Sequence, residues 1–342
     1  MKLGLIGLVL GVVLLGGLIY LLGAADVGRD VLRAGWALPG AIAIHMSQLA
    51  VSALAWNASL EHVSVPLVYR ARLIREAVNS LLPVAQIGGP VVGARLLTKA
   101  GVPPARAGAA TTLDLMLEAV AQIVFTLAAV AIVVSVGSDR SWIGWTEGGL
   151  AASTLGLAAF VGIQRMGGLR LIEAAAERLM RRWPSLPLAG LRGLHADLMK
   201  LQAKPSVIAR GVAWHTLSWA MGAAEVWLIL RAMDHPVSPA TGFVIESFGM
   251  MARSAAFAVP GALGVQEGGF VFAAGLFGLP AEAAVALSMV KRLRELIVGG
   301  VGIAVWLWPK RNSANSKLSK PFEPARASQS EPFAIRSRKP DG

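Results

Sequence analysis

The sequence predicts an all-α protein that crosses the membrane several times, and three observations support this fold class. First, 55% of the 342 residues are hydrophobic and 15% are charged, whereas soluble domains carry about 25% charged residues. Second, apolar runs of helical length recur, and a helix needs about 20 residues to cross hydrocarbon. Third, these runs are continuous, whereas membrane β-strands alternate between apolar and polar residues. The composition excludes an ordinary soluble enzyme and a disordered chain.

Six apolar segments are predicted as transmembrane helices. The first is longer than the ~7–15-residue apolar core of a signal peptide, so we expect it to remain as a span. The fourth is shorter than the others. In chain order the six are Leu3–Gly23, Trp36–Trp56, Thr111–Val136, Leu150–Ile163, Ile208–Leu230 and Glu282–Trp308.

Basic segments alternate with neutral or acidic ones, which predicts the orientation of the spans. Lys and Arg exceed Asp and Glu in 61–106, in 165–205 and after 309, but not in the loops between the other spans. The positive-inside rule therefore places both termini in the cytoplasm. We expect 1–308 to be the membrane domain and 309–342 a disordered basic tail. The segment 165–205 is either an amphipathic helix on anionic lipid or a solvated loop helix.

Two further apolar segments, Leu67–Lys99 and Phe243–Phe277, are interrupted by proline and glycine. Sliding one over the other at an offset of 177 aligns Pro83 with Pro260 and Glu118 with Glu295. Three crossings lie between the copies, so they enter from opposite faces. This predicts two inverted repeats (1–137 and 147–308), each with three transmembrane helices and a re-entrant helical hairpin. Two kinked full spans are the alternative.

Charged residues within apolar segments are candidates for function, because each costs ~2.5–3.5 kcal/mol to insert. Asp114 and Glu118 share a helix face, as do Lys291 and Glu295, and the offset makes Asp114 equivalent to Lys291. Pairing that only fixes helix to helix is the alternative, and Arg292 is expected to snorkel towards the interface. The candidate substrate-binding and translocation residues are Arg75, Glu76, Gln86, Arg95, Asp114, Glu118, Glu225, Arg253, Pro260, Gly261, Gly264, Gln266, Glu267, Lys291, Arg294 and Glu295.

Motifs for other chemistry are absent from the sequence. It has no cysteine, no His-Glu-x-x-His, no Walker loop and no Gly-x-Ser-x-Gly. We therefore expect no metal, no cofactor and no catalytic residue, and no nucleic-acid partner. His45 and His215 are interpreted as hydrogen-bonded intramembrane histidines, with a proton-relay or head-group role as the alternative.

The run Pro260-Gly261-Ala262-Leu263-Gly264-Val265-Gln266-Glu267 resembles the Pro-Gly-Gly-x-Gly-x-x-Glu signature of the lysylphosphatidylglycerol synthase transmembrane (flippase-like) family. The run Asn79–Leu97 resembles that family's first-half motif, and the chain is most similar to the hopanoid-biosynthesis-associated group. The resemblance implies a bacterial inner-membrane protein with two re-entrant elements that translocates lipid.

The resemblance also assigns particular positions. It places Glu267 on the motif glutamate and Arg253 on the preceding arginine, while Ala262 replaces a motif glycine. Pro90 stands at the first-half position where an acidic residue is common, which weakens any mechanism with two symmetric carboxylates. The aminoacyl-transferase domain of full-length synthases is not among these 342 residues, so lysyl transfer is not implied.

The leading functional hypothesis is a protein that moves an anionic phospholipid, a hopanoid or a related lipid across the inner membrane, with one repeat rocking against the other. One alternative is a membrane-embedded lipid-modifying enzyme, which would need a metal-binding Asp cluster or a nucleophile–base pair. Another is a scaffold for a hopanoid or lipid biosynthesis complex. The expected partners are membrane lipids and, for the scaffold, membrane enzymes of lipid synthesis. The oligomeric state is left open.

Overall fold

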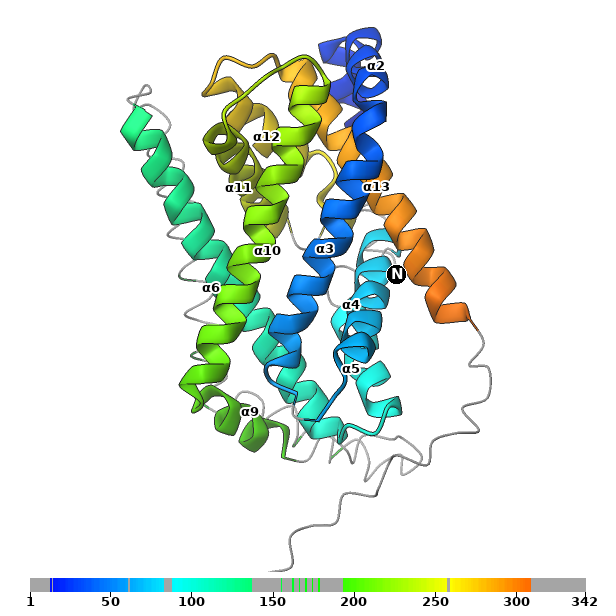
Figure 1. The fold of residues 1–342 in the computed structure, drawn as a ribbon, viewed down its shortest axis with the longest axis vertical. Coiled ribbons are helices and arrows are strands. Elements are labelled where there is room, and N and C mark those ends of the chain that lie inside the picture. Colours follow the sequence, from blue (N-terminus) through cyan, green and yellow to red (C-terminus); the bar gives the residue numbers. More distant parts are fainter. Residues whose placement is uncertain are drawn as a thin grey trace, which may run out of the picture. The chain divides into compact units, whose positions relative to one another are not determined.

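The part of the chain that the structure describes is helical throughout. The computed structural model describes residues 13, 15–60, 62–82, 88–136, 193–256 and 259–308, with single residues at 155, 162, 166, 170, 174 and 178. Within these ranges there are helices and no strand, which confirms the all-α prediction (Figure 1). Most of the fourth predicted span, most of the basic segment 165–205, the tail 309–342 and Gln86 lie outside the described residues. The bundle described below belongs to the unit Met1–Trp306.

The N-terminal part of the bundle is a nearly continuous helical segment. Residues 15–22 are helical, and Gly23 ends this stretch with φ 89°. Helix α2 (Ala24–Arg33), the 3₁₀ turn η1 (Ala34–Ala37) and α3 (Leu38–Asn57) follow without a break. The second predicted span therefore corresponds to α3. The expectation of a loop before it is wrong, because α2 is amphipathic and buries Val27 and Asp30.

Three long helices correspond to other predicted spans. They are α6 (Pro104–Val136), α10 (Pro205–Ala232) and α13 (Ala281–Leu307), and the short helix α9 (Leu194–Gln202) precedes α10. Among the described residues, two helical segments are long and apolar enough to cross a membrane, 24–57 and 104–135. Helix α13 has 27 residues, but its run of charges between 291 and 295 interrupts the apolar sequence.

Both interrupted segments form helical hairpins. Helix α4 (Val65–Leu81) packs on α5 (Gly88–Lys99), and α11 (Pro239–Ala255) packs on α12 (Val265–Gly275), preceded by the turn η5 (Pro260–Ala262). The starts of α5 and α12 are 177 residues apart, as are those of α6 and α13. Figure 1 shows α4 and α5 towards one end of α3 and α10, and α11 and α12 towards the other.

The two halves of the sequence interlock. Helix α10 packs against α3 and α6 of the first half. In the other direction, α4 lies so close to α13 that a Cβ at Gly302 would come within 2.8 Å of the Leu73 carbonyl oxygen, and one at Gly299 within 2.8 Å of Leu81. Small residues let membrane helices approach in this way. Each half therefore contributes helices to the surroundings of the other.

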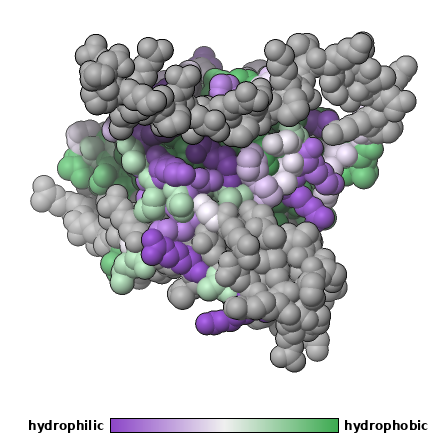
Figure 2. Space-filling model, turned by 90° about the horizontal axis from the view of Figure 1, so that it is seen from below, coloured by the Kyte–Doolittle hydropathy of each residue, from purple (hydrophilic) through white to green (hydrophobic). Residues whose placement is uncertain are grey.

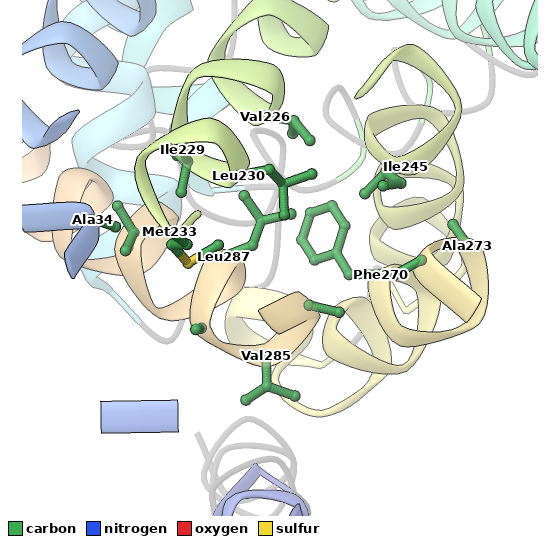
Figure 3. Packing of buried hydrophobic residues seen from close by; sticks show 14 of the residues in the cluster. Ala34, Val226, Ile229, Leu230, Met233, Ile245, Phe270, Ala273, Val285 and Leu287 are labelled. Carbon is green, nitrogen blue, oxygen red and sulfur yellow. The ribbon is translucent and has the colours of Figure 1, made fainter. Parts of the chain in front are cut away.

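Among the described residues, two large apolar clusters and a small one around Leu49, Leu73 and Val298 fill the spaces between these helices. One joins α10, α11, α12 and α13, where the Phe270 ring lies among Leu230, Ile245 and Leu287 (Figure 3). The other joins α3, α4, α6 and α9 around Trp56 and Leu113. Figure 2 views the end of the bundle that carries α9. Hydrophilic side chains lie in the middle of the described surface there, with hydrophobic ones at its edges.

Candidate functional site

In the part of the chain that the structure describes, three groups of buried ion pairs lie between the hairpins and the long helices. We name them after one carboxylate each: the Asp114 cluster, the Glu225 cluster and the Glu267 cluster. Burying a charge is costly unless an opposite charge and hydrogen bonds compensate it. The positions of these pairs therefore mark the polar part of the interior.

The Asp114 cluster joins α4 to α6. The two Nη atoms of Arg72 donate to Asp114 Oδ2 and Glu118 Oε1, both at 2.9 Å. Arg75 repeats the pattern, with distances of 2.6 Å to Asp114 Oδ2 and 3.1 Å to Glu118 Oε2. His215 Nε2 of α10 lies 3.0 Å from the other Asp114 oxygen. The Asp114 side chain has no exposed surface. Spacings of three on α4 and four on α6 put each pair on one helix face.

The Glu225 cluster joins α10, α11 and α13. Lys291 Nζ donates to Glu246 Oε2 at 2.6 Å and lies 3.9 Å from Glu225 Oε2, while Arg294 Nε donates to Glu225 Oε1 at 3.0 Å. A methyl group at Gly222 would lie 2.6 Å from Glu246 Oε1, so the glycine admits this carboxylate. Helix α11 carries Glu246 into the interior, where its side chain is buried.

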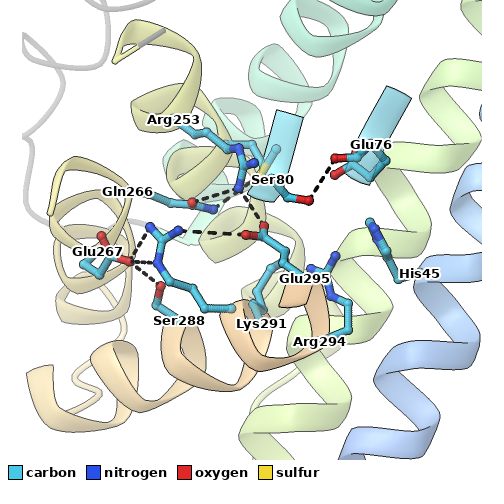
Figure 4. Close-up of polar contacts among 12 residues, drawn as sticks. His45, Glu76, Ser80, Arg253, Gln266, Glu267, Ser288, Lys291, Arg294 and Glu295 are labelled. Atoms are coloured by element: carbon cyan, nitrogen blue, oxygen red, sulfur yellow. Dashed lines mark hydrogen bonds and ion pairs between the residues drawn. The ribbon is translucent and has the colours of Figure 1, made fainter. Parts of the chain in front are cut away.

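The Glu267 cluster holds the second hairpin against α13 (Figure 4). Glu267 accepts hydrogen bonds from the Gly264 N–H, Ser288 Oγ and Arg292 Nε at 2.7, 2.7 and 2.8 Å. The first of these caps α12, so one carboxylate both starts the helix and binds the neighbouring one.

Arg253 and Arg292 complete the Glu267 cluster. Arg253 Nη1 donates to Glu295 Oε1 at 2.7 Å and to Gln266 Oε1 at 3.2 Å. The snorkelling expected of Arg292 is wrong: its side chain is 16% exposed and pairs with Glu267 at 2.7 Å and with Glu295 at 3.8 Å. The buried carboxylates compensate the guanidinium locally, which favours the interior over the interface.

The break before α12 depends on backbone conformations that favour glycine. Gly261 and Gly264 have φ of 65° and 80°, in the left-handed region. Ala262, at the position where the resembling motif has glycine, has φ 49°. The left-handed conformation costs an ordinary residue ~1–2 kcal/mol. Pro260 begins the short turn η5.

The structure brings most predicted site residues together, but not as one group. Asp114 and Lys291, equivalent at the 177-residue offset, lie in different clusters and do not pair with each other. Arg95 is exposed on α5, and no ion pair or hydrogen bond of its side chain occurs among the described residues. Gln86 lies outside those residues. The residues joined by clusters or forming the break are Arg75, Asp114, Glu118, Glu225, Arg253, Pro260, Gly261, Gly264, Gln266, Glu267, Lys291, Arg294 and Glu295.

Four participants were missed from the sequence: Arg72, Glu246, Ser288 and Arg292. Arg72 carries a readable signal, because it precedes Arg75 by three residues and so shares its helix face. The two histidines also have partners: His215 binds Asp114, and His45 Nδ1 lies 3.0 Å from Gln48 Oε1. Nowhere in the described ranges are three His, Asp or Glu side chains arranged to hold a metal ion.

Comparison with known proteins identifies the family. A family model described as lysylphosphatidylglycerol synthase TM region matches residues 4–302. No curated protein and no solved structure matches the chain. The match covers the hairpins, the long helices and all three clusters, and with the helical fold it shows a helical membrane protein in a lipid-related family. The chain belongs to the family of the lysylphosphatidylglycerol synthase TM region.

Proposed function

We propose that this protein translocates a lipid, an anionic phospholipid, a hopanoid or a related lipid, across the bacterial inner membrane. One observation carries the proposal: six basic and six acidic side chains of the described chain pair with one another inside a helical membrane bundle. A protein that only needed to span the membrane would not require them, because intramembrane charges are expensive.

The arrangement of the two hairpins supports an inverted repeat. The hairpins lie towards opposite ends of α3 and α10 (Figure 1), and helix starts recur at a separation of 177 residues. Irregular backbone is tolerated at membrane depth only when protein covers it or water reaches it. We propose that both hairpins are re-entrant, enter from opposite faces and expose a polar route when they move. Cytoplasmic termini, as the charge of the segments predicts, complete this topology.

The chemistry of the clusters suits a charged lipid head group. Arg253 and Arg292 flank the break before α12, and each is neutralised by a carboxylate. A phosphate can replace a carboxylate at a guanidinium, because both accept two parallel hydrogen bonds. A head group entering at the break would exchange partners with these pairs, while its apolar tails stayed in the surrounding lipid.

Lipid translocation is testable in proteoliposomes that contain fluorescent analogues of an anionic phospholipid, a zwitterionic phospholipid and a hopanoid. A membrane-impermeant quencher reports the fraction of label in the outer leaflet with time. We expect wild-type protein to accelerate exchange of at least one analogue. Glu267→Gln removes the charge that three donors share and should slow exchange about tenfold or more. Glu282→Gln, the same substitution at a half-buried glutamate at the start of α13, is the control and should match wild type.

Wild-type rates equal to those of protein-free vesicles for all three analogues would refute translocation. The mutual pairing of the twelve charges within the clusters favours a second candidate, a scaffold for a lipid-synthesis complex in which charges only fix the helices. The scaffold predicts that Glu267→Gln and Arg253→Ala, if folded, leave the cellular lipid profile unchanged, whereas deletion of 310–342 alters it. Translocation predicts that the two point variants alter the cellular lipid profile more than the deletion does.

A further inference from the structure

Glu76 on α4 is a charged side chain that belongs to none of the three ion-pair clusters of the described chain. The six basic side chains of the three clusters are matched by six acidic ones, so the paired network is neutral. They are Arg72, Arg75, Arg253, Lys291, Arg292 and Arg294, with Asp114, Glu118, Glu225, Glu246, Glu267 and Glu295. Glu76 adds a seventh carboxylate. It is half-buried on α4, and within the described residues its carboxylate has no hydrogen bond and no ion pair.

Arg253 is the basic residue of the second hairpin, which α4 approaches at the turn η5. Among the basic residues of α4, Arg72 lies four residues before Glu76 and so shares its helix face. Figure 4 shows Ser80 of α4 next to the Arg253–Glu295 pair, with Glu76 one helical turn away on the same helix, and α4 contacts the turn η5 of the second hairpin. Arg72 already has two carboxylates at 2.9 Å. Arg253 has one carboxylate within ion-pair distance, so it is the cation better able to accept another partner.

Glu76 and Arg253 are also equivalent positions of the two halves. They are 177 residues apart, the separation of the starts of α5 and α12. Both lie on the first helix of their hairpin, and each hairpin thus presents a charge of opposite sign at the same position. Equivalent residues that lie near each other mark the place where the two hairpins face one another. A contact there responds to any relative movement of the hairpins.

We propose that Glu76 is the second acceptor of Arg253. In the conformation described here, Arg253 binds Glu295 and Gln266 and ties α11 to α13. When the hairpins move, Arg253 leaves Glu295 and pairs with Glu76, which ties α11 to α4. One guanidinium therefore stabilises two arrangements of the hairpins in turn, and its charge is compensated in both. Glu76 is a positioning residue in this scheme. The inference rests on the proposed translocation for its purpose, but the exchange of partners can be tested without transport.

The first test is a double-mutant cycle of Glu76 and Glu295, in which the thermal unfolding midpoint of each variant is measured in detergent. Glu76→Gln removes no hydrogen bond of the described conformation, so we expect it to shift the midpoint by less than about 1 °C. Glu295→Gln removes the present acceptor and forces Arg253 onto Glu76. In that background Glu76→Gln should lower the midpoint by a further ~3 °C or more, the shift typical of about one lost buried interaction. Equal effects of Glu76→Gln in both backgrounds would overturn the proposal.

A matched control and a milder variant complete the cycle. Glu282→Gln is the same substitution at a half-buried glutamate that also has no ion pair among the described residues, at the start of α13. It should be silent in both backgrounds. If Glu295→Gln does not fold, Glu295→Asp weakens the same pair and keeps the charge, and the difference between backgrounds should be smaller but of the same sign.

The second test measures lipid exchange in the same proteoliposomes. Glu76→Gln should slow exchange about tenfold, the loss of one hydrogen bond to a charged group, although it leaves the unfolding midpoint unchanged. An active wild type with an equally active Glu76→Gln variant overturns the role of Glu76 alone. An inactive wild type refutes the proposed function, while the unfolding cycle still decides whether Arg253 has a second acceptor.

Discussion

Removal of the Asp114 charge is the sharpest test of the buried network. Asp114 accepts hydrogen bonds from Arg72 and Arg75 and contacts His215, and its side chain has no exposed surface. Asp114→Asn preserves the volume but leaves two guanidinium groups to share Glu118. Breaking a buried pair by removing one partner costs about 3–5 kcal/mol. Because Glu118 remains, we expect a loss near 3 kcal/mol, a fall of the unfolding midpoint by about 6–12 °C.

The assay is thermal unfolding of purified protein in one detergent at one scan rate, followed by tryptophan fluorescence. Asp197→Asn is the matched control, because Asp197 pairs with Lys200 at 3.5 Å on the surface of α9, where the lysine side chain is 70% exposed. Such a pair contributes about 0–1 kcal/mol. A midpoint for Asp114→Asn within about 1 °C of wild type would refute the conclusion that the Asp114 cluster stabilises the bundle.

Two further predictions concern helix packing and capping. Gly249→Ala should lower the stability by about 1–3 kcal/mol, because a methyl group there would overlap the buried Phe270 ring; Gly300→Ala on α13, with open space around it, should be neutral or slightly stabilising. Unfolding midpoints of both variants check this, and equal values would contradict the packing. Asn79→Ala should cost about 0.5–2 kcal/mol, since its side chain accepts the Gly89 N–H at 2.9 Å at the start of α5. Faster hydrogen exchange in α5 alone is expected, and unchanged exchange would contradict the capping role.

The helices of the fold were readable from the sequence where hydropathy and helix breakers agree. Continuous apolar runs located α3, α10 and α13 to within a few residues, and Pro and Gly located the interruptions between α4 and α5 and between α11 and α12. These signals depend on the local sequence alone, so they can be read without knowing which helices pack together. Helix α6 begins at Pro104, seven residues before the predicted span, because its first turns contain Arg106 and small residues, which are less hydrophobic than the run that follows.

The partners of the charged residues were not readable, because pairing depends on which helix faces which. Arg292 is one residue from Lys291, and periodicity alone does not show that Glu267 of another helix approaches it. Glu246 lies in α11, and its position in the sequence does not show that Lys291 of α13 approaches it. The sequence could identify the side chains that are costly in a membrane, whereas their sorting into three clusters required the packing of α4 on α13 and of α10 on α6.

The interlocking of the halves has a consequence for how the polypeptide can be divided. Because α10 covers α3 and α6, and α13 receives α4 at Gly299 and Gly302, neither half encloses its own polar side chains. Two fragments cut between 136 and 193 should each be degraded when expressed alone and should reassemble when co-expressed. The same entanglement favours movement of the hairpin arms over a rotation of one half as a rigid body against the other.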